Sequence, residues 1–177
     1  MNIYYSEHDI DEGFEILEAE SKHDRIARGR RVSRPSGWAL FHHLKGHPIK
    51  CRFCGIQADR WVVEKGPRDL VSSPVMNLFA GGTMMTRDHY IPKSLGGKDH
   101  VANLLPACAP CNETRSNTVD EHVIEFARLH PELIDPERIK KGLQSLKNQI
   151  ANRTFNGKQN AAEVARLEAP FRAMGYL

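Results

Sequence analysis

The sequence lacks a long apolar run. Its longest stretch without a charged residue spans residues 70–86. That stretch is interrupted by polar and turn-forming residues, namely Ser72, Ser73, Pro74, Asn77, Gly81 and Gly82. A membrane-spanning helix needs roughly 20 mainly apolar residues, so no membrane span is predicted. Internal repeats and low-complexity tracts are absent as well, and a content of 40% hydrophobic residues is typical of a globular chain.

The first 20 residues lack lysine and arginine and contain seven acids instead. A secretory signal places positive charge before an apolar run, so this segment does not resemble one. We therefore expect a cytoplasmic protein. Cysteines in that reducing compartment rarely form disulfides, and the four cysteines of this chain need another explanation.

Positive charge is concentrated directly after the acidic segment. Residues 21–50 contain a single acid, Asp24, and eight basic residues. The eight are Lys22, Arg25, Arg28, Arg30, Arg31, Arg34, Lys45 and Lys50. Such a block is typical of a solvated helix face or of an electrostatic contact with a polyanion, and charge alone leaves both interpretations open.

Composition divides the chain into three expected parts. Residues 1–47 form an acidic and then basic extension that we expect to be helical, and residues 118–177 form a second helical extension. Between them, residues 48–117 are rich in glycine and proline, with strand-like runs at 60–64 and 84–91. Because this central part has little continuous apolar sequence, we expect it to need a staple, that is, a cross-link that stabilises a small core.

The spacing of apolar residues predicts helices in both extensions. The first begins near Ile10 and is expected to end near Gly29. After the central part, residues 118–121 fit a capping box that starts a second helix. Asp135-Pro136 resembles the cap and first-turn proline of a third.

A last helix is expected after a turn at Asn156-Gly157. Val164, Leu167 and Phe171 supply its apolar spacing. Pro170 is expected to cut this helix short, because proline removes a helical hydrogen bond.

The cysteines form two C-x2-C pairs, Cys51/Cys54 and Cys108/Cys111. Two such pairs complete the tetrahedral shell of four sulfurs that Zn²⁺ prefers. A redox centre needs only one pair, and four merely buried cysteines are not expected at this spacing. All four ligands are used, so the predicted zinc is structural. His47 is a substitute ligand to consider.

Polar residues typical of a catalytic site lie between the two cysteine pairs. Asp88 and His89 are neighbours at the end of a strand-like run, and the glycine-rich residues 93–97 follow. Asn103 comes next, and Asn112 opens a helix directly after the last cysteine. Each feature alone has an ordinary explanation, such as a local turn or a helix cap. Their order within the cysteine frame is specific.

In this order the residues resemble the HNH endonuclease family, in the variant framed by two C-x2-C pairs. The resemblance covers residues 51–117 and is clearest from Asp88-His89-Tyr90-Ile91-Pro92 to Cys111-Asn112. It implies an α+β fold with a small zinc-stapled ββα-metal core, here flanked by N- and C-terminal helices. In that family two antiparallel strands and a helix surround one catalytic divalent ion, and the proteins cleave nucleic acid phosphodiesters.

The resemblance also implies roles for individual residues. His89 corresponds to the general base, Asp88 and Asn112 to metal ligands, and Asn103 to the residue that orients the base. Many family members have a histidine where Asn112 stands. An oxygen-ligated site selective for Mg²⁺ or Mn²⁺ is therefore expected here, rather than a second zinc.

Several cations are candidates for contacts with the nucleic acid. Arg115 lies three residues after Asn112, on the same face of the expected helix, and is a candidate to reach the phosphate. Arg87 and Lys93 are the other candidates, and a solvated surface role is at least an equal alternative for each of the three. The basic segment and the Lys/Arg face around residues 138–158 are expected to contact the DNA backbone. A solvated surface or a protein docking site is the alternative for these flanks.

The family resemblance thus implies a metal-dependent DNA endonuclease that leaves 5′-phosphate and 3′-hydroxyl ends. A single site cuts one strand, so a monomer should nick, and double-strand cleavage would require a homodimer or two encounters. RNA is not excluded as the substrate. The alternative from another class is a zinc-stapled nucleic-acid-binding or assembly protein with an inactive HNH site. Small nucleases of this kind are often phage-borne.

Overall fold

The computed structural model describes residues 3–21, 23–65, 74–115, 119–155 and 161–177. It contains both helices and sheet, which confirms the predicted α+β class. The chain forms two compact units. The first comprises Met1–Asp88 and Leu105–Arg115, and the second comprises His89–Leu104 and Ser116–Leu177. The expected division at residues 47 and 117 stays a prediction.

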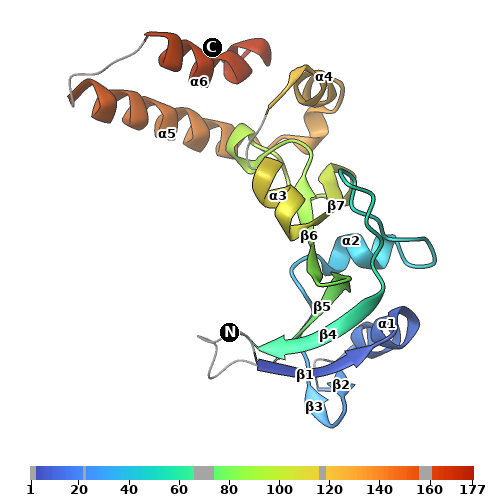
Figure 1. Cartoon of the computed structure of the whole chain (residues 1–177). Helices are drawn as coiled ribbons and strands as arrows, with labels where there is room; N and C mark the ends of the chain where they lie inside the picture. The colour runs from blue at the N-terminus through green and yellow to red at the C-terminus, as the bar shows by residue number, and fades with distance from the viewer. Residues whose placement is uncertain (1–2, 22, 66–73, 116–118, 156–160) are drawn as a thin grey trace. The chain divides into compact units, whose positions relative to one another are not determined.

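A five-stranded sheet in the order β1-β4-β5-β6-β7 forms the centre of the first unit (Figure 1). Its strands are β1 (Ile3–His8), β4 (Arg60–Lys65), β5 (Val75–Ala80), β6 (Thr83–His89) and β7 (Leu104–Cys108). The pairs β1/β4, β4/β5 and β5/β6 are antiparallel. The strands predicted near 60–64 and 84–91 are confirmed as β4 and β6. Helix α3 (Ala109–Arg115) follows β7, so β6, β7 and α3 stand in the expected ββα order.

The core of the first unit is built around Trp61 on β4, which is fully buried. Helices α1 (Ile10–Glu18) and α2 (Trp38–His43) pack against it through Phe14 and Phe41, whose rings lie 5.3 and 6.2 Å from the Trp61 ring in edge-on geometry. The indole N–H of Trp61 also donates to the carbonyl of Ile10 at 3.1 Å. Burying large aromatic side chains of this kind contributes about 1.5–3 kcal/mol each.

The N-terminal extension differs from the helix predicted to end near Gly29, because α1 ends at Glu18. No basic residue lies in the last turn of α1 to offset the helix dipole. The following residues instead form a hairpin of β2 (Ile26–Ala27) and β3 (Arg30–Arg31). Strand β1, which was also not predicted, adds the edge of the sheet.

The second unit is mainly helical. Its elements are the short 3₁₀ turns η1 (Lys93–Leu95), η2 (Val101–Asn103) and η3 (Pro131–Leu133) and the helices α4 (Glu121–Leu129), α5 (Pro136–Phe155) and α6 (Ala161–Ala173). A cluster of buried apolar side chains holds them together, formed by Ile91, Leu95, Ala127, Leu133, Ile134, Ile139 and Phe171. Among the described residues, no helix is both long enough and apolar enough to span a membrane.

The predicted C-terminal helices are present, with two differences. The carboxylate of Asp120 caps α4 by accepting from the amide of Val123, whereas Thr118 lies outside the described residues. Asp135 caps α5 as predicted. Helix α6 continues through Pro170, contrary to the expectation, because the buried Phe171 anchors its last turn in the core. The predicted turn at Asn156-Gly157 also lies outside the described residues.

Candidate HNH nuclease site

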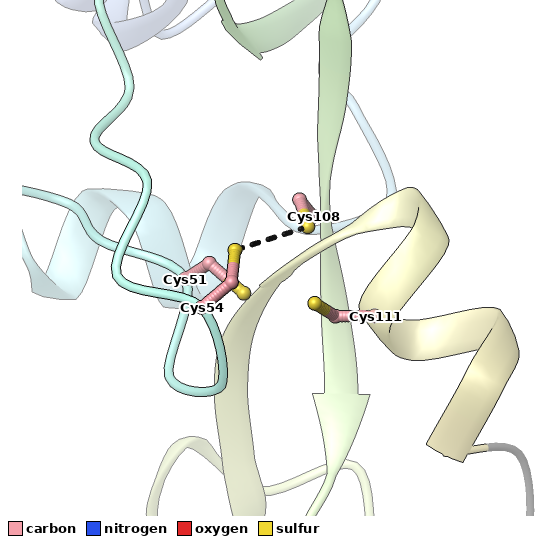
Figure 2. A group of neighbouring side chains, drawn as sticks. All are labelled: Cys51, Cys54, Cys108 and Cys111. Carbon is pink, nitrogen blue, oxygen red and sulfur yellow. Dashed lines mark hydrogen bonds between the residues drawn. The ribbon is translucent and has the colours of Figure 1, made fainter.

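The four cysteines of the first unit converge on one point (Figure 2). Cys51 and Cys54 lie in the loop before β4, Cys108 ends β7, and Cys111 lies in α3. All four sulfurs lie within 4.8 Å of one another, and none is in a disulfide. Gly55 adopts a φ of 76° just after the first pair, which is the backbone conformation that closes such a tight loop.

The spacing of the sulfurs fits a tetrahedral zinc ion. Zinc–sulfur bonds of about 2.3 Å give sulfur–sulfur edges of about 3.8 Å. The Sγ atoms of Cys54 and Cys108 are 3.7 Å apart. Nothing in this geometry requires the substitute ligand His47. The predicted cysteine cluster is therefore present, and its donor set suits Zn²⁺.

The acid–base properties of the cysteines also point to a cation. Burial opposes ionisation of Cys51, but backbone N–H groups of both cysteine loops outweigh it and lower the pKa of Cys51 to about 6. The hydrogen bond with Cys108, together with burial and the charge on Cys51, raises the pKa of Cys111 to about 12. Several thiolates this close repel one another, and a divalent cation would relieve the repulsion.

Beside the cysteines, α3 faces the end of β6. The side-chain amide of Asn112 donates to Thr86 Oγ1 at 2.9 Å and to the carbonyl of Arg87 at 3.3 Å. Both contacts use the nitrogen, which leaves the amide oxygen as the atom that suits a hard cation. One turn further on, Arg115 Nη1 lies 2.7 Å from Asp88 Oδ2, and both side chains are largely buried. The two predicted metal ligands thus belong to adjoining parts of one unit.

His89 begins the second unit, and its imidazole contacts a residue that the sequence did not single out. Nε2 of His89 lies 3.0 Å from Oδ1 of Asp99. Lys93 and Arg138 also contact the Asp99 carboxylate, at 3.0 and 3.1 Å. The only sequence signal for Asp99 is its position shortly after the glycine pair of the loop.

The protonation of Asp99 determines which imidazole nitrogen is basic. Burial opposes ionisation, but hydrogen bonds from Lys93, Arg138 and His89 outweigh it and hold the pKa of the Asp99 carboxyl well below its usual value. An ionised carboxylate only accepts hydrogen bonds. Nε2 of a neutral His89 must therefore carry the proton that Asp99 accepts, and Nδ1 is the basic nitrogen.

Asn103 is fully buried and fastens the loop that follows His89. Its side-chain oxygen accepts from the amide of Ile91 at 2.8 Å, and its nitrogen donates to the carbonyls of Ile91 and Lys98 at 3.1 and 3.0 Å. Its own carbonyl accepts from the amide of Tyr90. Asn103 therefore fixes the backbone directly after His89, which is one way of orienting the imidazole.

The three candidate phosphate contacts are all engaged within the protein. Arg115 pairs with Asp88, and Lys93 pairs with Asp99. Arg87 is partly exposed at the end of β6 and has a partner of its own. Their roles in binding phosphate stay predictions.

Comparison with known families agrees with this geometry. Residues 80–126 match the family described as HNH endonuclease. The matched segment contains Asp88, His89, Asn103 and Asn112 and the second cysteine pair, whereas the first pair precedes it. The family resemblance predicted from the sequence is therefore confirmed for residues 80–126. Comparisons with curated proteins and with solved structures found no match.

Proposed function

We propose that this protein is a metal-dependent HNH endonuclease that hydrolyses DNA phosphodiester bonds. The match of residues 80–126 to the HNH endonuclease family supports a nuclease and implies a nucleic acid substrate. The observation that carries the more specific proposal is the contact between His89 and Asp99, because it prepares an imidazole for proton transfer.

In the proposed reaction, His89 is the general base. Its Nδ1 takes a proton from water as the water attacks the phosphorus, and the resulting imidazolium is stabilised by the ionised Asp99 on the opposite side of the ring. Lys93 and Arg138 keep Asp99 ionised and fix its position. Asn103 holds the loop, so that the imidazole does not have to be ordered again in each turnover.

Asp88 and Asn112 would hold the catalytic cation through their side-chain oxygens. A bound Mg²⁺ or Mn²⁺ supplies Lewis acidity that offsets charge on the phosphate and on the departing 3′ oxygen. The bond between phosphorus and that oxygen breaks, and the departing oxygen takes a proton from solvent water, which leaves a 5′-phosphate and a 3′-hydroxyl. One such site cuts one strand, so the monomer is proposed to nick DNA and a homodimer to cut both strands.

The second candidate is a zinc-stapled nucleic-acid-binding or assembly protein without catalysis. The ion pair of Arg115 with Asp88 favours it, because Arg115 already neutralises the carboxylate that a cation would need. In the proposed nuclease, by contrast, Asp88 would still offer its other carboxylate oxygen to the cation while Arg115 stays on Oδ2, and Arg115 would help to balance the charge of the phosphate.

Nicking of supercoiled plasmid by the zinc-loaded full chain separates the two candidates. With Mg²⁺ or Mn²⁺ the parent should produce open circles, and His89→Ala should lower the rate by about 10²–10⁴-fold, as loss of a general base does. His43→Ala, an exposed histidine on α2, is the matched control and should nick like the parent. A parent that binds plasmid without nicking it would favour the second candidate, and equal nicking by His89→Ala would refute the role of the base.

The cytoplasmic location, the homodimer, RNA as an alternative substrate and a phage-like origin stay predictions from the sequence.

A further inference from the structure

The β2–β3 hairpin of the first unit carries an unusual density of positive charge. Residues 25–34 include five arginines and no acid. The hairpin turns at Arg28-Gly29, and Ala27 pairs with Arg30 across it (Figure 1). Charge of one sign held in so short an element is unfavourable for the isolated protein unless it meets a polyanion or has internal partners.

Two of the five arginines have internal partners at the base of the hairpin. Arg34 donates to the carbonyl of Leu17 at 2.8 Å, and Arg25 donates to the carbonyl of Ala19 at 3.3 Å. These carbonyls lie at the end of α1, where helix carbonyls lack helical partners. Arg25 and Arg34 therefore attach the hairpin to the body of the unit.

The other three arginines are exposed. Arg30 lies over the ring of Tyr5 on β1 at 4.7 Å, and Arg28 and Arg31 extend from the turn and from β3. Within the described part of the chain, no carboxylate pairs with Arg28, Arg30 or Arg31. The base is thus fastened, while the turn and β3 carry three exposed arginines, one of which, Arg30, lies over the Tyr5 ring.

The backbone conformation of the turn does not account for an arginine at position 28. Arg28 has a φ of 47°, and it is the one residue other than glycine with positive φ among the described residues. Asparagine, aspartate or glycine adopts this conformation more readily in a two-residue hairpin turn. When a residue occupies a backbone conformation that is unfavourable for its type, its side chain is a candidate for a functional role.

We propose that the β2–β3 hairpin binds the phosphate backbone of duplex DNA through Arg28, Arg30 and Arg31. A two-stranded ribbon fits the major groove of B-form DNA, which is about 12 Å wide, and arginines at its tip and edge then reach the flanking phosphates. The deep, narrow major groove of A-form RNA does not admit such a ribbon. This inference rests on the proposed nuclease function, because it identifies the surface through which that nuclease would bind its DNA substrate.

The test is the affinity of the full chain for a fluorescently labelled DNA duplex of mixed sequence. Binding is followed by anisotropy without added Mg²⁺ or Mn²⁺, so that it is independent of cleavage. Each phosphate contact contributes about 0.9 to the slope of log K against log salt. Arg28→Gln/Arg31→Gln should reduce that slope by about 1.8 and weaken binding by roughly 60-fold at 0.1 M salt.

Arg128→Gln/Arg172→Gln is the charge-matched control, because it also removes two exposed positive charges but lies on α4 and α6. It should leave the slope within a few tenths of that of the parent. An equal loss of slope in both double variants would overturn the proposal, because binding would then follow net charge alone. Equal or tighter binding to duplex RNA of the same sequence would also overturn it.

Arg28→Asn separates a binding role from a structural one. Asparagine relieves the backbone at this position, so the thermal midpoint should stay the same or rise while DNA affinity falls by roughly eightfold at 0.1 M salt. Unchanged affinity in this variant would refute a contact by Arg28. If hairpin variants lose binding and the parent never nicks, the nuclease proposal fails alone; if the parent nicks and the hairpin variants bind normally, only the hairpin proposal fails.

Discussion

Replacing Asn103 by leucine should destabilise the second unit strongly. The two side chains are similar in size, so the main change is the loss of three hydrogen bonds to backbone groups of Ile91 and Lys98. Each buried group left without a partner costs about 1–3 kcal/mol, and the sum over the three groups is roughly 3–9 kcal/mol. For a unit of this size the thermal midpoint should fall by about 12 °C or more.

Circular dichroism during thermal and urea unfolding measures this effect. Asn148→Leu is the matched control, because Asn148 is exposed on α5 and, among the described residues, its side chain hydrogen-bonds only to Gln144 in the neighbouring turn. It should change the unfolding free energy by no more than about 0.5 kcal/mol, as surface substitutions usually do. If Asn103→Leu were as stable as the parent, the claim that Asn103 fastens the loop after His89 would be wrong.

Three further predictions concern other parts of the two units. Cys51→Ser should reduce bound zinc from one ion per chain to none, as measured by metal analysis of the dialysed protein. Because a structural zinc contributes on the order of 10 kcal/mol, the variant should also unfold at a lower temperature than the parent. A parent that is equally stable without metal would contradict a structural role for the zinc. Asp99→Asn should lower the unfolding free energy at pH 7. The pKa of the parent Asp99 lies below its usual 3.8, so the ionised carboxylate stabilises the folded state above about pH 4 and this contribution is lost as the pH falls through the lowered value. Urea unfolding from pH 7 to pH 2 should therefore show a steeper acid loss for the parent than for the variant, and parallel curves would argue against the ion cluster. Gly97→Ala should destabilise the same loop, since its Cβ would overlap the carbonyl oxygen of Ile91. At Gly46, by contrast, an added Cβ meets no atom of the described residues within 4 Å, so Gly46→Ala should cost only the strain of its positive φ.

The parts of the site that sequence predicted are those fixed by local spacing. Each C-x2-C pair closes a short loop, so the cysteines could be assigned to one ion without knowledge of the fold. The strand near residues 84–91 was predicted from its strand-like run, and Asn112 was expected to open a helix directly after the last cysteine, whereas α3 begins at Ala109. Asp99 was missed because its contact with His89 depends on how the glycine-rich loop folds back toward β6. No short-range sequence pattern predicts that loop conformation.

The errors in the fold have similar causes. Helix α1 was extended too far because Ile26 continues the helical spacing, although it lies in a strand of the hairpin. The turn at Arg28-Gly29 lacks the Asn-Gly or Asp-Gly signal of such hairpins. Strand β5 was missed because Phe79, which faces away from the buried side, is apolar and hides the alternation. In each case tertiary packing decided between two local interpretations.

The most direct test of the account is the binding of Mn²⁺ to the zinc-loaded full chain, measured by electron paramagnetic resonance of the free ion. The account predicts one exchangeable Mn²⁺ per chain in addition to the zinc, and predicts that Asp88→Ala/Asn112→Ala loses this Mn²⁺ while keeping its zinc and its fold. A double variant that binds Mn²⁺ as well as the parent does, or a parent that nicks plasmid with zinc as its only metal, would contradict it.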